Sequence, residues 1–278
     1  MKTLLSALTA VTLLTAIPAS SLFAAEKADP KAQVQLLIPK FQAKSKAGKT
    51  AEADYADELK ELDALIAAQK DDKSDDSAGL VMLKAQIYAQ LFEDTEKATQ
   101  ILKQLKTDYP DTATSKQADR FLEMMEKQAA SSKIQNALKP GTQFPDFSEN
   151  DINGKPLSIA NYKGKVVLVD FWATWCGPCV AELPNVIAAY DKYHDKGFEI
   201  IGISLDSEKE KLDSFIASKK VTWPQFFDGQ GWQNKLAAQY GVNSIPATYL
   251  LDKEGKIIAK GLRGEALGAA VAKALGEN

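Results

Sequence analysis

The amino-acid sequence predicts two folded parts, an all-helical domain and then an α/β domain whose sheet has helices on both faces. Two continuous apolar runs, residues 166–172 and 198–205, are rich in β-branched and aromatic residues and favour buried strands. They alternate with patterns of helical spacing, which is typical of an α/β sheet. Between residues 30 and 128 every periodic pattern is helical, so this part is predicted to hold helices only.

The first 25 residues differ from the rest and predict a secretory signal peptide, residues 1–25. Lys2 precedes an apolar run from Leu4 to Ile17, and small residues follow up to Ala24–Ala25. The run is shorter than the ~20 residues of a comfortable membrane span. A cleaved signal would make the protein periplasmic or otherwise extracytoplasmic, and an uncleaved membrane anchor is the alternative.

Composition and charge indicate an ordinary folded protein without a general affinity for nucleic acid. Hydrophobic residues make up 45% of the 278 residues, charged residues make up 26%, and the formal net charge is -3. Lysines and acids are interspersed, and the chain has no long basic run that could follow a phosphate backbone. Only two cysteines occur, Cys176 and Cys179, which argues against a scaffold stapled by disulfides.

The predicted helical domain, residues 30–130, shows its clearest helical patterns near 51–69, 80–92, 95–109 and 114–127. Pro110 ends the third of these because proline cannot continue a helix. One weak copy of a tetratricopeptide-type hairpin is suggested by Ala85, Tyr88, Ala98 and Pro110, although such repeats normally stack in threes or more. Two interpretations stay open: a surface that docks a partner or dimerises, and a cap on the next domain.

Residues 131–142 lose the helical pattern and include Pro140–Gly141, so they are predicted to form a linker before the α/β domain at 143–278. Beyond the two apolar runs, strands are expected at 247–251 and 256–260, joined by a turn at Lys253–Glu254–Gly255. Helices are expected between the strands, at 179–193, 208–219, 232–240 and 265–275.

The two cysteines lie where a predicted strand ends and a predicted helix begins. A helix N-terminus offers unsatisfied N–H groups and a partial positive charge, and both stabilise a thiolate. In such C-x-x-C motifs the thiol pKa can fall from ~8.5 into a range of roughly 3.5–7.5. The spacing places both sulfurs on one face of the first turn, with Cys176 expected to be the more exposed and Cys179 beneath it. Pro178 is tolerated in a first helical turn.

Other uses of the cysteine pair fit the sequence poorly. A structural zinc site needs about four ligands, and the chain offers two cysteines and one histidine. A purely structural disulfide across two residues would close a very small loop and would gain little chain entropy. A cysteine hydrolase needs a histidine base, and His194 lies at the far end of the helix that begins with the cysteines. A reactive redox pair is therefore the favoured interpretation.

The segment VVLVDFWATWCGPCVAELP, residues 166–184, closely resembles the active-site segment of the thioredoxin superfamily. The preceding PGTQFPDFSENDINGKPLSIANYKGK resembles the leading hairpin of the TlpA/ResA branch of extracytoplasmic thioredoxin-like proteins, and NSIPATYLLDKEGKII matches the same branch. The resemblance covers residues 138–275, and the helical domain lies outside it. It implies a thioredoxin fold for the α/β domain, with a central mixed sheet flanked by helices.

The resemblance also implies a function. Cys176 corresponds to the attacking thiolate, Cys179 corresponds to the resolving thiol, and Gly177–Pro178 is the dipeptide of reducing thioredoxins. The implied activity is that of an extracytoplasmic thiol-disulfide oxidoreductase that reduces protein disulfides. A redox-active Cys176–Cys179 disulfide takes the place of a cofactor, and no metal is expected. The implied partners are a disulfide-bearing protein and an electron donor on the membrane side.

Substrate contacts are expected around the cysteine pair. Trp175 resembles the family tryptophan that covers part of the site. Ile245–Pro246 matches a cis-proline loop that faces the cysteines and pairs with substrate backbone, and an X–Pro bond is the one bond at which cis costs little. The expected substrate-binding residues are Trp175, Gly177, Pro178, Ile245 and Pro246.

Two carboxylates are expected to act on the pair. Asp170 lies in the predicted buried strand, where burial raises the pKa of a carboxyl group, and it matches the thioredoxin aspartate that accepts a proton from the second cysteine. Glu182 lies three residues after Cys179, one turn along the same helix face, and matches an acidic residue of the ResA type. The alternatives are a strand-edge position for Asp170 and a solvated helix position for Glu182.

Two other functions stay open at this point. The leading hairpin is shared with peroxiredoxins, which would make the protein a thiol peroxidase. Peroxidase chemistry in that family requires a threonine three residues before the attacking cysteine. Ala173 occupies that position here, and Thr174 is the next residue. The second alternative is a partner-docking protein whose helical half carries the main function.

Overall fold

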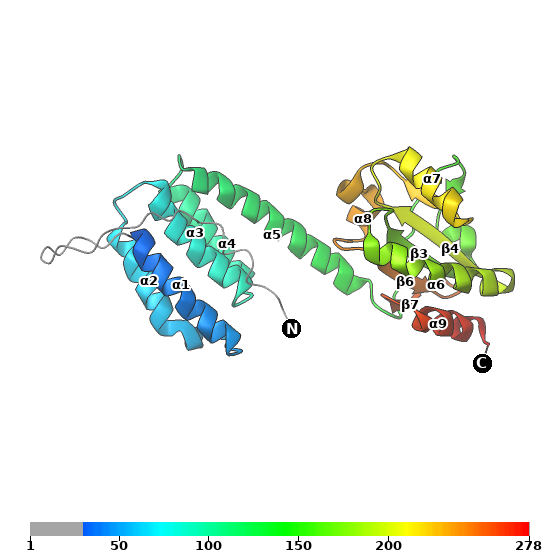
Figure 1. Ribbon diagram of the computed structural model, residues 1–278, viewed down its shortest axis with the longest axis horizontal. Coiled ribbons are helices and arrows are strands. Elements are labelled where there is room, and N and C mark those ends of the chain that lie inside the picture. Colours follow the sequence, from blue (N-terminus) through cyan, green and yellow to red (C-terminus); the bar gives the residue numbers. More distant parts are fainter. Residues whose placement is uncertain (1–29, 278) are drawn as a thin grey trace, which may run out of the picture. The chain divides into compact units, whose positions relative to one another are not determined.

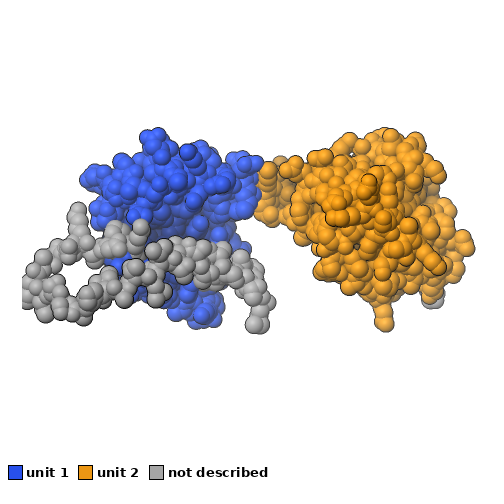
Figure 2. All heavy atoms as spheres, turned by 45° about the horizontal axis from the view of Figure 1, so that its top comes forward, with its two compact units in different colours: residues 1–126 blue, residues 127–278 orange. Residues whose placement is uncertain are grey.

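The structure is a computed structural model that describes residues 30–277 (Figure 1). The predicted signal peptide, residues 1–25, lies outside the described residues. The chain divides into two compact units, residues 1–126 and residues 127–278 (Figure 2). Within the described range, no helix is both long enough and apolar enough to cross a membrane.

Unit 1 is helical, as the sequence predicts. Its helices are α1 (Pro30–Lys46), α2 (Ala56–Ala68), α3 (Asp75–Gln90), α4 (Thr95–Asp108) and the first part of α5 (Ala113–Ala137). Side chains cap two of them: Ser74 accepts a hydrogen bond from the Ser77 N–H before α3, and Asp94 accepts one from the Lys97 N–H before α4. Apolar side chains at helical spacing form the core, among them Leu59, Leu62, Ile87, Leu102 and Leu105.

The structure differs from the prediction at residues 131–142. Helix α5 continues to Ala137, so the expected linker is reduced to a short turn around Pro140–Gly141. No glycine or proline interrupts residues 113–137. Ile134 packs against the main core of unit 2, and Leu138 is buried in it. Tertiary packing therefore extends the helix beyond the point where its own amphipathic pattern ends.

Unit 2 is built on a five-stranded mixed sheet with the order β5–β4–β3–β6–β7, which is the predicted thioredoxin fold (Figure 1). Central β3 pairs in parallel with β4 and antiparallel with β6. The strands are β3 (Val166–Trp172), β4 (Phe198–Ser204), β5 (Gln225–Phe227), β6 (Ala247–Leu251) and β7 (Ile257–Lys260). The sequence did not predict β5, because three residues are too few to show a period. The leading hairpin forms a separate pair, β1 (Glu149–Asn150) and β2 (Pro156–Leu157).

Helices cover both faces of the sheet (Figure 1). On one face, α6 (Gly177–Tyr193) and α9 (Glu265–Leu275) pack over Val166 and Leu168 of β3. On the other face, α7 (Lys209–Lys219), α8 (Lys235–Gln239) and the end of α5 pack over Val167, Val169 and Phe171. Because successive strand side chains alternate between faces, Asp170 shares the α6 face with Leu168.

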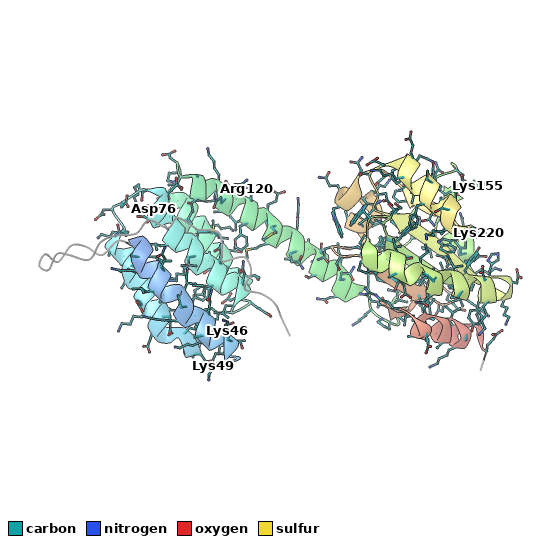
Figure 3. All side chains as sticks on the ribbon, viewed as in Figure 1. Lys46, Lys49, Asp76, Arg120, Lys155 and Lys220 are labelled. Atoms are coloured by element: carbon teal, nitrogen blue, oxygen red, sulfur yellow. A yellow bond between two sulfur atoms is a disulfide. The ribbon has the colours of Figure 1, made fainter. Side chains whose placement is uncertain are left out.

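Figure 3 labels two charged side chains on the surface of unit 2, Lys155 and Lys220. Lys155 lies in the turn of the leading hairpin, and Lys220 follows the last residue of α7; both are exposed. Lys220 adopts the left-handed conformation with φ 57°, which lets its N–H close the C-terminus of α7.

A close approach between β4 and β5 requires a glycine at position 202. A Cβ atom added to Gly202 would lie 2.0 Å from Oε1 of Gln225. That buried amide oxygen accepts a hydrogen bond of 2.9 Å from Nε1 of Trp172, the last residue of β3. The glycine therefore makes room for a side chain that satisfies a buried indole N–H at the end of β3, the central strand of the sheet.

We expect Gly202→Ala to lower the free energy of unfolding of unit 2 by about 2–4 kcal/mol, since it displaces Gln225 and leaves the Trp172 N–H without its acceptor. Urea unfolding followed by tryptophan fluorescence measures this. The matched control is Gly268→Ala in α9, where an added Cβ meets no atom within 4 Å. It should leave stability unchanged or raise it by up to ~1 kcal/mol. Equal stability of Gly202→Ala and the wild type would contradict the packing described for Gly202.

Candidate active site

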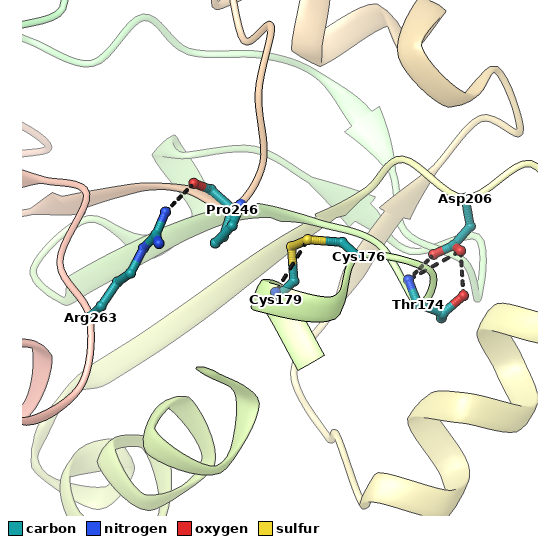
Figure 4. Close-up of a disulfide and its surroundings, with 6 residues drawn as sticks. All are labelled: Thr174, Cys176, Cys179, Asp206, Pro246 and Arg263. Atoms are coloured by element: carbon teal, nitrogen blue, oxygen red, sulfur yellow. Dashed lines mark hydrogen bonds between the residues drawn. A yellow bond between two sulfur atoms is a disulfide. The ribbon is translucent and has the colours of Figure 1, made fainter. Parts of the chain in front are cut away.

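The two cysteines form a disulfide at the first turn of α6, with their Cα atoms 5.2 Å apart (Figure 4). Cys176 is the N-cap residue in an extended conformation, and its Sγ accepts a hydrogen bond of 3.2 Å from the backbone N–H of Cys179. The expected difference in exposure is absent, because the exposed fractions are 6% for Cys176 and 5% for Cys179. Both cysteines belong to the main apolar core of unit 2.

The local sequence explains why a helix begins at this point. The buried strand β3 ends at Trp172, and the three residues Ala173–Trp175 turn the chain toward α6. Gly177 and Pro178 open the helix, and a proline in the first turn forgoes an N–H that has no partner within the helix. The Cys176 sulfur therefore sits at the positive end of a helix of 17 residues.

Asp170 lies beneath the disulfide, on the α6 face of β3. Its side chain is buried, and burial raises the pKa of its carboxyl group from 3.8 to about 7, with the negative charge of Glu182 as a second cause. The burial of its side chain excludes the alternative that Asp170 is a solvated residue at the edge of the strand. Asp170, Cys179, Glu182 and Pro246 line a common cavity of about 10 Å³, close to the volume that one water molecule needs.

Glu182 lies one turn along α6 from Cys179 and is half-buried rather than fully solvated. Its Oε1 accepts a hydrogen bond of 2.6 Å from the backbone N–H of Gly264, and its Oε2 accepts one of 3.2 Å from Asn185. Gly264 precedes α9 with a φ of 57°, a conformation that glycine adopts readily. The carboxylate therefore joins the start of α9 to α6, in addition to placing negative charge near Asp170.

The structure brings Ile245–Pro246 to the disulfide. The Ile245–Pro246 peptide bond is cis, as the sequence predicts. Ala247 pairs with Phe171 in the antiparallel register of β6 and β3, so Pro246 lies next to the end of β3. The Pro246 carbonyl accepts a hydrogen bond of 3.3 Å from Nη2 of Arg263 (Figure 4). Sequence reasoning missed Arg263, because a lone arginine in a loop carries no sign of its distant partner.

Sequence reasoning also missed Asp206, a buried acid two residues after the end of β4. Its carboxylate accepts hydrogen bonds from the Thr174 N–H at 3.1 Å and from the Thr174 hydroxyl at 2.5 Å (Figure 4). A third comes from the Ser204 hydroxyl at 2.8 Å. Thr174 thus holds the turn before Cys176 in place, and its hydroxyl is directed to Asp206.

No group of three or more His, Cys, Asp or Glu side chains that could hold a metal ion occurs among residues 30–277. His194 lies at the C-terminal end of α6, where its Nδ1 is 3.3 Å from the Phe198 carbonyl oxygen and 3.4 Å from the Glu199 carboxylate. It is therefore at the opposite end of the helix from Cys176.

The burial of Asp170 predicts a pH-dependent stability. Because its pKa is raised from 3.8 to about 7 on folding, the folded state holds the proton more tightly than the unfolded state. The resulting stabilisation is complete below pH ~4 and is lost as the pH rises through ~7. Asp170→Asn removes this titration, so the stability of the wild type relative to Asp170→Asn should fall by about 2–3 kcal/mol between pH 5 and pH 8.

Urea unfolding of the oxidised proteins at both pH values measures the difference. The matched control is Asp213→Asn, which removes an exposed carboxylate on α7 that pairs with Lys209. Its stability relative to the wild type should change little between the same pH values. A constant difference between the wild type and Asp170→Asn would contradict the raised pKa.

Comparison with known proteins places unit 2 among thiol-disulfide oxidoreductases. Residues 140–260 match the AhpC/TSA family. Thiol-disulfide oxidoreductase ResA of Bacillus thuringiensis subsp. konkukian is 34% identical over 128 residues, which are 46% of this chain and 72% of that protein. ResA of Bacillus subtilis is 31% identical over 122 residues, 44% of this chain and 66% of that protein.

Among solved structures, the thioredoxin domain of a thiol-disulfide oxidoreductase from Bacteroides vulgatus is 36% identical, with a TM-score of 0.46. The match covers 49% of this chain and 97% of that one. The AhpC/TSA match contains the disulfide, Asp170, Glu182 and Pro246, while the helices of unit 1 lie outside it. With more than two thirds of the Bacillus thuringiensis protein matched, the chain belongs to the ResA family of thiol-disulfide oxidoreductases.

Proposed function

We propose that the protein is an extracytoplasmic reductant of protein disulfides that reacts through Cys176 and Cys179. The observation that carries this proposal is the placement of a disulfide at the N-terminus of α6, with Cys179 and the buried carboxyl group of Asp170 lining the same cavity. The helix end favours a thiolate, and the carboxyl group can exchange a proton beside the second sulfur. Disulfide exchange needs both a stabilised thiolate and a group that accepts or returns a proton.

The first step of the proposed reaction is attack by the Cys176 thiolate on a substrate disulfide. An S–S bond forms between Cys176 and the substrate, and the other substrate sulfur leaves with the electron pair and takes up a proton. Attack requires the thiolate form, which the partial positive charge at the start of α6 stabilises. The residue that begins the helix is therefore the nucleophile.

The second step releases the substrate. The Cys179 thiol gives its proton to the Asp170 carboxylate, and the new thiolate attacks Cys176 in the mixed disulfide. The second substrate sulfur leaves and is protonated, so two electrons have passed from the cysteine pair to the substrate. A carboxyl group with a pKa of about 7 suits this transfer, because near neutral pH it is neither always protonated nor always charged. The small cavity that both residues line supports a relay through one water molecule.

The direction of electron flow is proposed from the residues between the cysteines. Gly177 and Pro178 form the dipeptide of reducing thioredoxins, and both are exposed. A reductant outside the cytoplasm must itself be reduced, so the proposal includes an electron donor on the membrane side. The extracytoplasmic location is supported by Lys2 and the apolar run from Leu4 to Ile17, which together match the pattern of a secretory signal.

The redox potential tests the direction. We expect the Cys176–Cys179 couple to lie nearer the ~−270 mV of thioredoxin than the ~−120 mV of a strong oxidant. The purified protein is equilibrated with glutathione buffers of graded ratio, and the fraction of reduced protein is measured by thiol alkylation and mass spectrometry. Cys179→Ser, which cannot form the disulfide, is the control that shows how much glutathione is held at Cys176 as a mixed disulfide at each ratio. A potential near −120 mV would overturn the proposed direction and would make the protein an oxidant.

A further inference from the structure

Two tryptophans of unit 2 lie largely in solvent beside the disulfide. The exposed fraction is 52% for Trp175, which immediately precedes Cys176, and 51% for Trp232, which lies in a short 3-10 turn after β5. Their ring centroids are 5.9 Å apart and their planes are inclined by 57°. Neither ring belongs to the two apolar cores of unit 2, so the fold does not use them to bury its own surface.

The end of β4 fixes the loops that carry both tryptophans. On one side, the buried carboxylate of Asp206 holds Thr174, the residue before Trp175, through the hydrogen bonds from its N–H and hydroxyl group. On the other side, the buried Asn234 side chain donates to the Ser204 carbonyl oxygen at 3.2 Å, two residues after Trp232. The same strand end therefore sets the position of the aromatic pair.

The second loop is further braced by Asp228. Its Oδ1 accepts a hydrogen bond of 3.1 Å from the Asn234 side chain, and its Oδ2 accepts one of 2.8 Å from the backbone N–H of Lys235. Asn234 also caps α8 by accepting a hydrogen bond of 2.9 Å from the Ala237 N–H. An exposed aromatic ring on a braced loop loses little conformational freedom when it binds a partner, which is a property of strong interface residues.

The burial of the Cys176 sulfur indicates which part of a substrate would contact the two tryptophan rings. Cys176 is 6% exposed, so a substrate sulfur that reaches it brings its neighbouring residues against the turn that carries Trp175. A shallow, open depression lies beside Thr174 and along α7, and Phe215 is among the residues that line it. A polypeptide can supply both the sulfur and an apolar side chain next to it.

We propose that Trp175 and Trp232 together form a docking surface for a large apolar or aromatic side chain that adjoins the reacting cysteine of the substrate polypeptide. This inference rests on the proposed function, and it adds a substrate preference to it. Trp232 contributes through direct contact with substrate, whereas Asp206 and Asn234 are positioning residues that act through the two loops.

The test uses two symmetrical disulfide-linked dimers of a short peptide, which differ only in carrying phenylalanine or serine on both sides of the cysteine. The full-length protein is reduced in advance and freed of reductant, so each turnover oxidises one Cys176–Cys179 pair and releases two peptide thiols. Second-order rate constants are measured by acid quenching and chromatography. We expect the wild type to reduce the phenylalanine peptide about tenfold faster than the serine peptide.

Trp232→Ala should bring the ratio of the two rate constants to within about twofold of one, because half of the aromatic surface is removed. Trp232→Phe, which keeps an aromatic ring, should retain most of the preference. The matched control is Ile258→Ala in β7, which removes another exposed apolar side chain (38% exposed) from the same unit. Its ratio should equal that of the wild type.

The outcomes separate the two proposals. If the wild type reduces both peptides at equal rates, or if Trp232→Ala keeps the wild-type ratio, the docking surface is wrong while the reductase function stands. If the reduced wild type reduces neither peptide, the reductase function itself fails, and the docking surface fails with it. Circular dichroism of each variant verifies that a changed ratio does not come from a changed fold.

Discussion

The site depends on one constraint: the fully buried central strand β3 is joined by a short turn to α6, the helix that begins at the cysteines. β3 is covered by helices on both faces, so its register cannot slip without placing polar atoms in a core. That register fixes the side of the sheet on which Asp170 lies and the point at which α6 begins. The sulfur at the helix end and the carboxyl group below it are therefore set by the packing of a single strand.

Two neighbouring segments are attached to this junction by carboxylates. Asp206 holds the turn before Cys176, and Glu182 holds the start of α9, while Asp170 lines the small cavity that Cys179 also lines. Arg263, next to the glycine that Glu182 binds, reaches the carbonyl oxygen of Pro246. The loops at the disulfide thus come from distant parts of the sequence and are oriented by specific polar contacts, which is how a reactive centre on loops is held in a fixed geometry.

The sequence predicted the strands, helix faces and buried positions that depend mainly on the pattern of neighbouring residues. The apolar run 166–172 is the observed β3, the helical spacing of Leu59 and Leu62 marks a buried helix face, and the strand context of Asp170 predicts its burial. The features that were missed depend on partners far away in the chain. Helix α5 extends because Ile134 meets the core of unit 2, and neither Asp206 nor Trp232 can be assigned a role until Thr174 and Trp175 are placed beside them.

The most direct test of the central constraint is the pH dependence of alkylation at Cys176 in Cys179→Ser, where a single thiol remains. If the start of α6 stabilises the thiolate, the rate of reaction with iodoacetamide should reach half of its plateau below pH ~7.5, within the range of cysteines that open a helix in C-x-x-C motifs. A half-plateau at pH ~8.5 or above, the behaviour of an ordinary thiol, would contradict the activation of Cys176 by the helix.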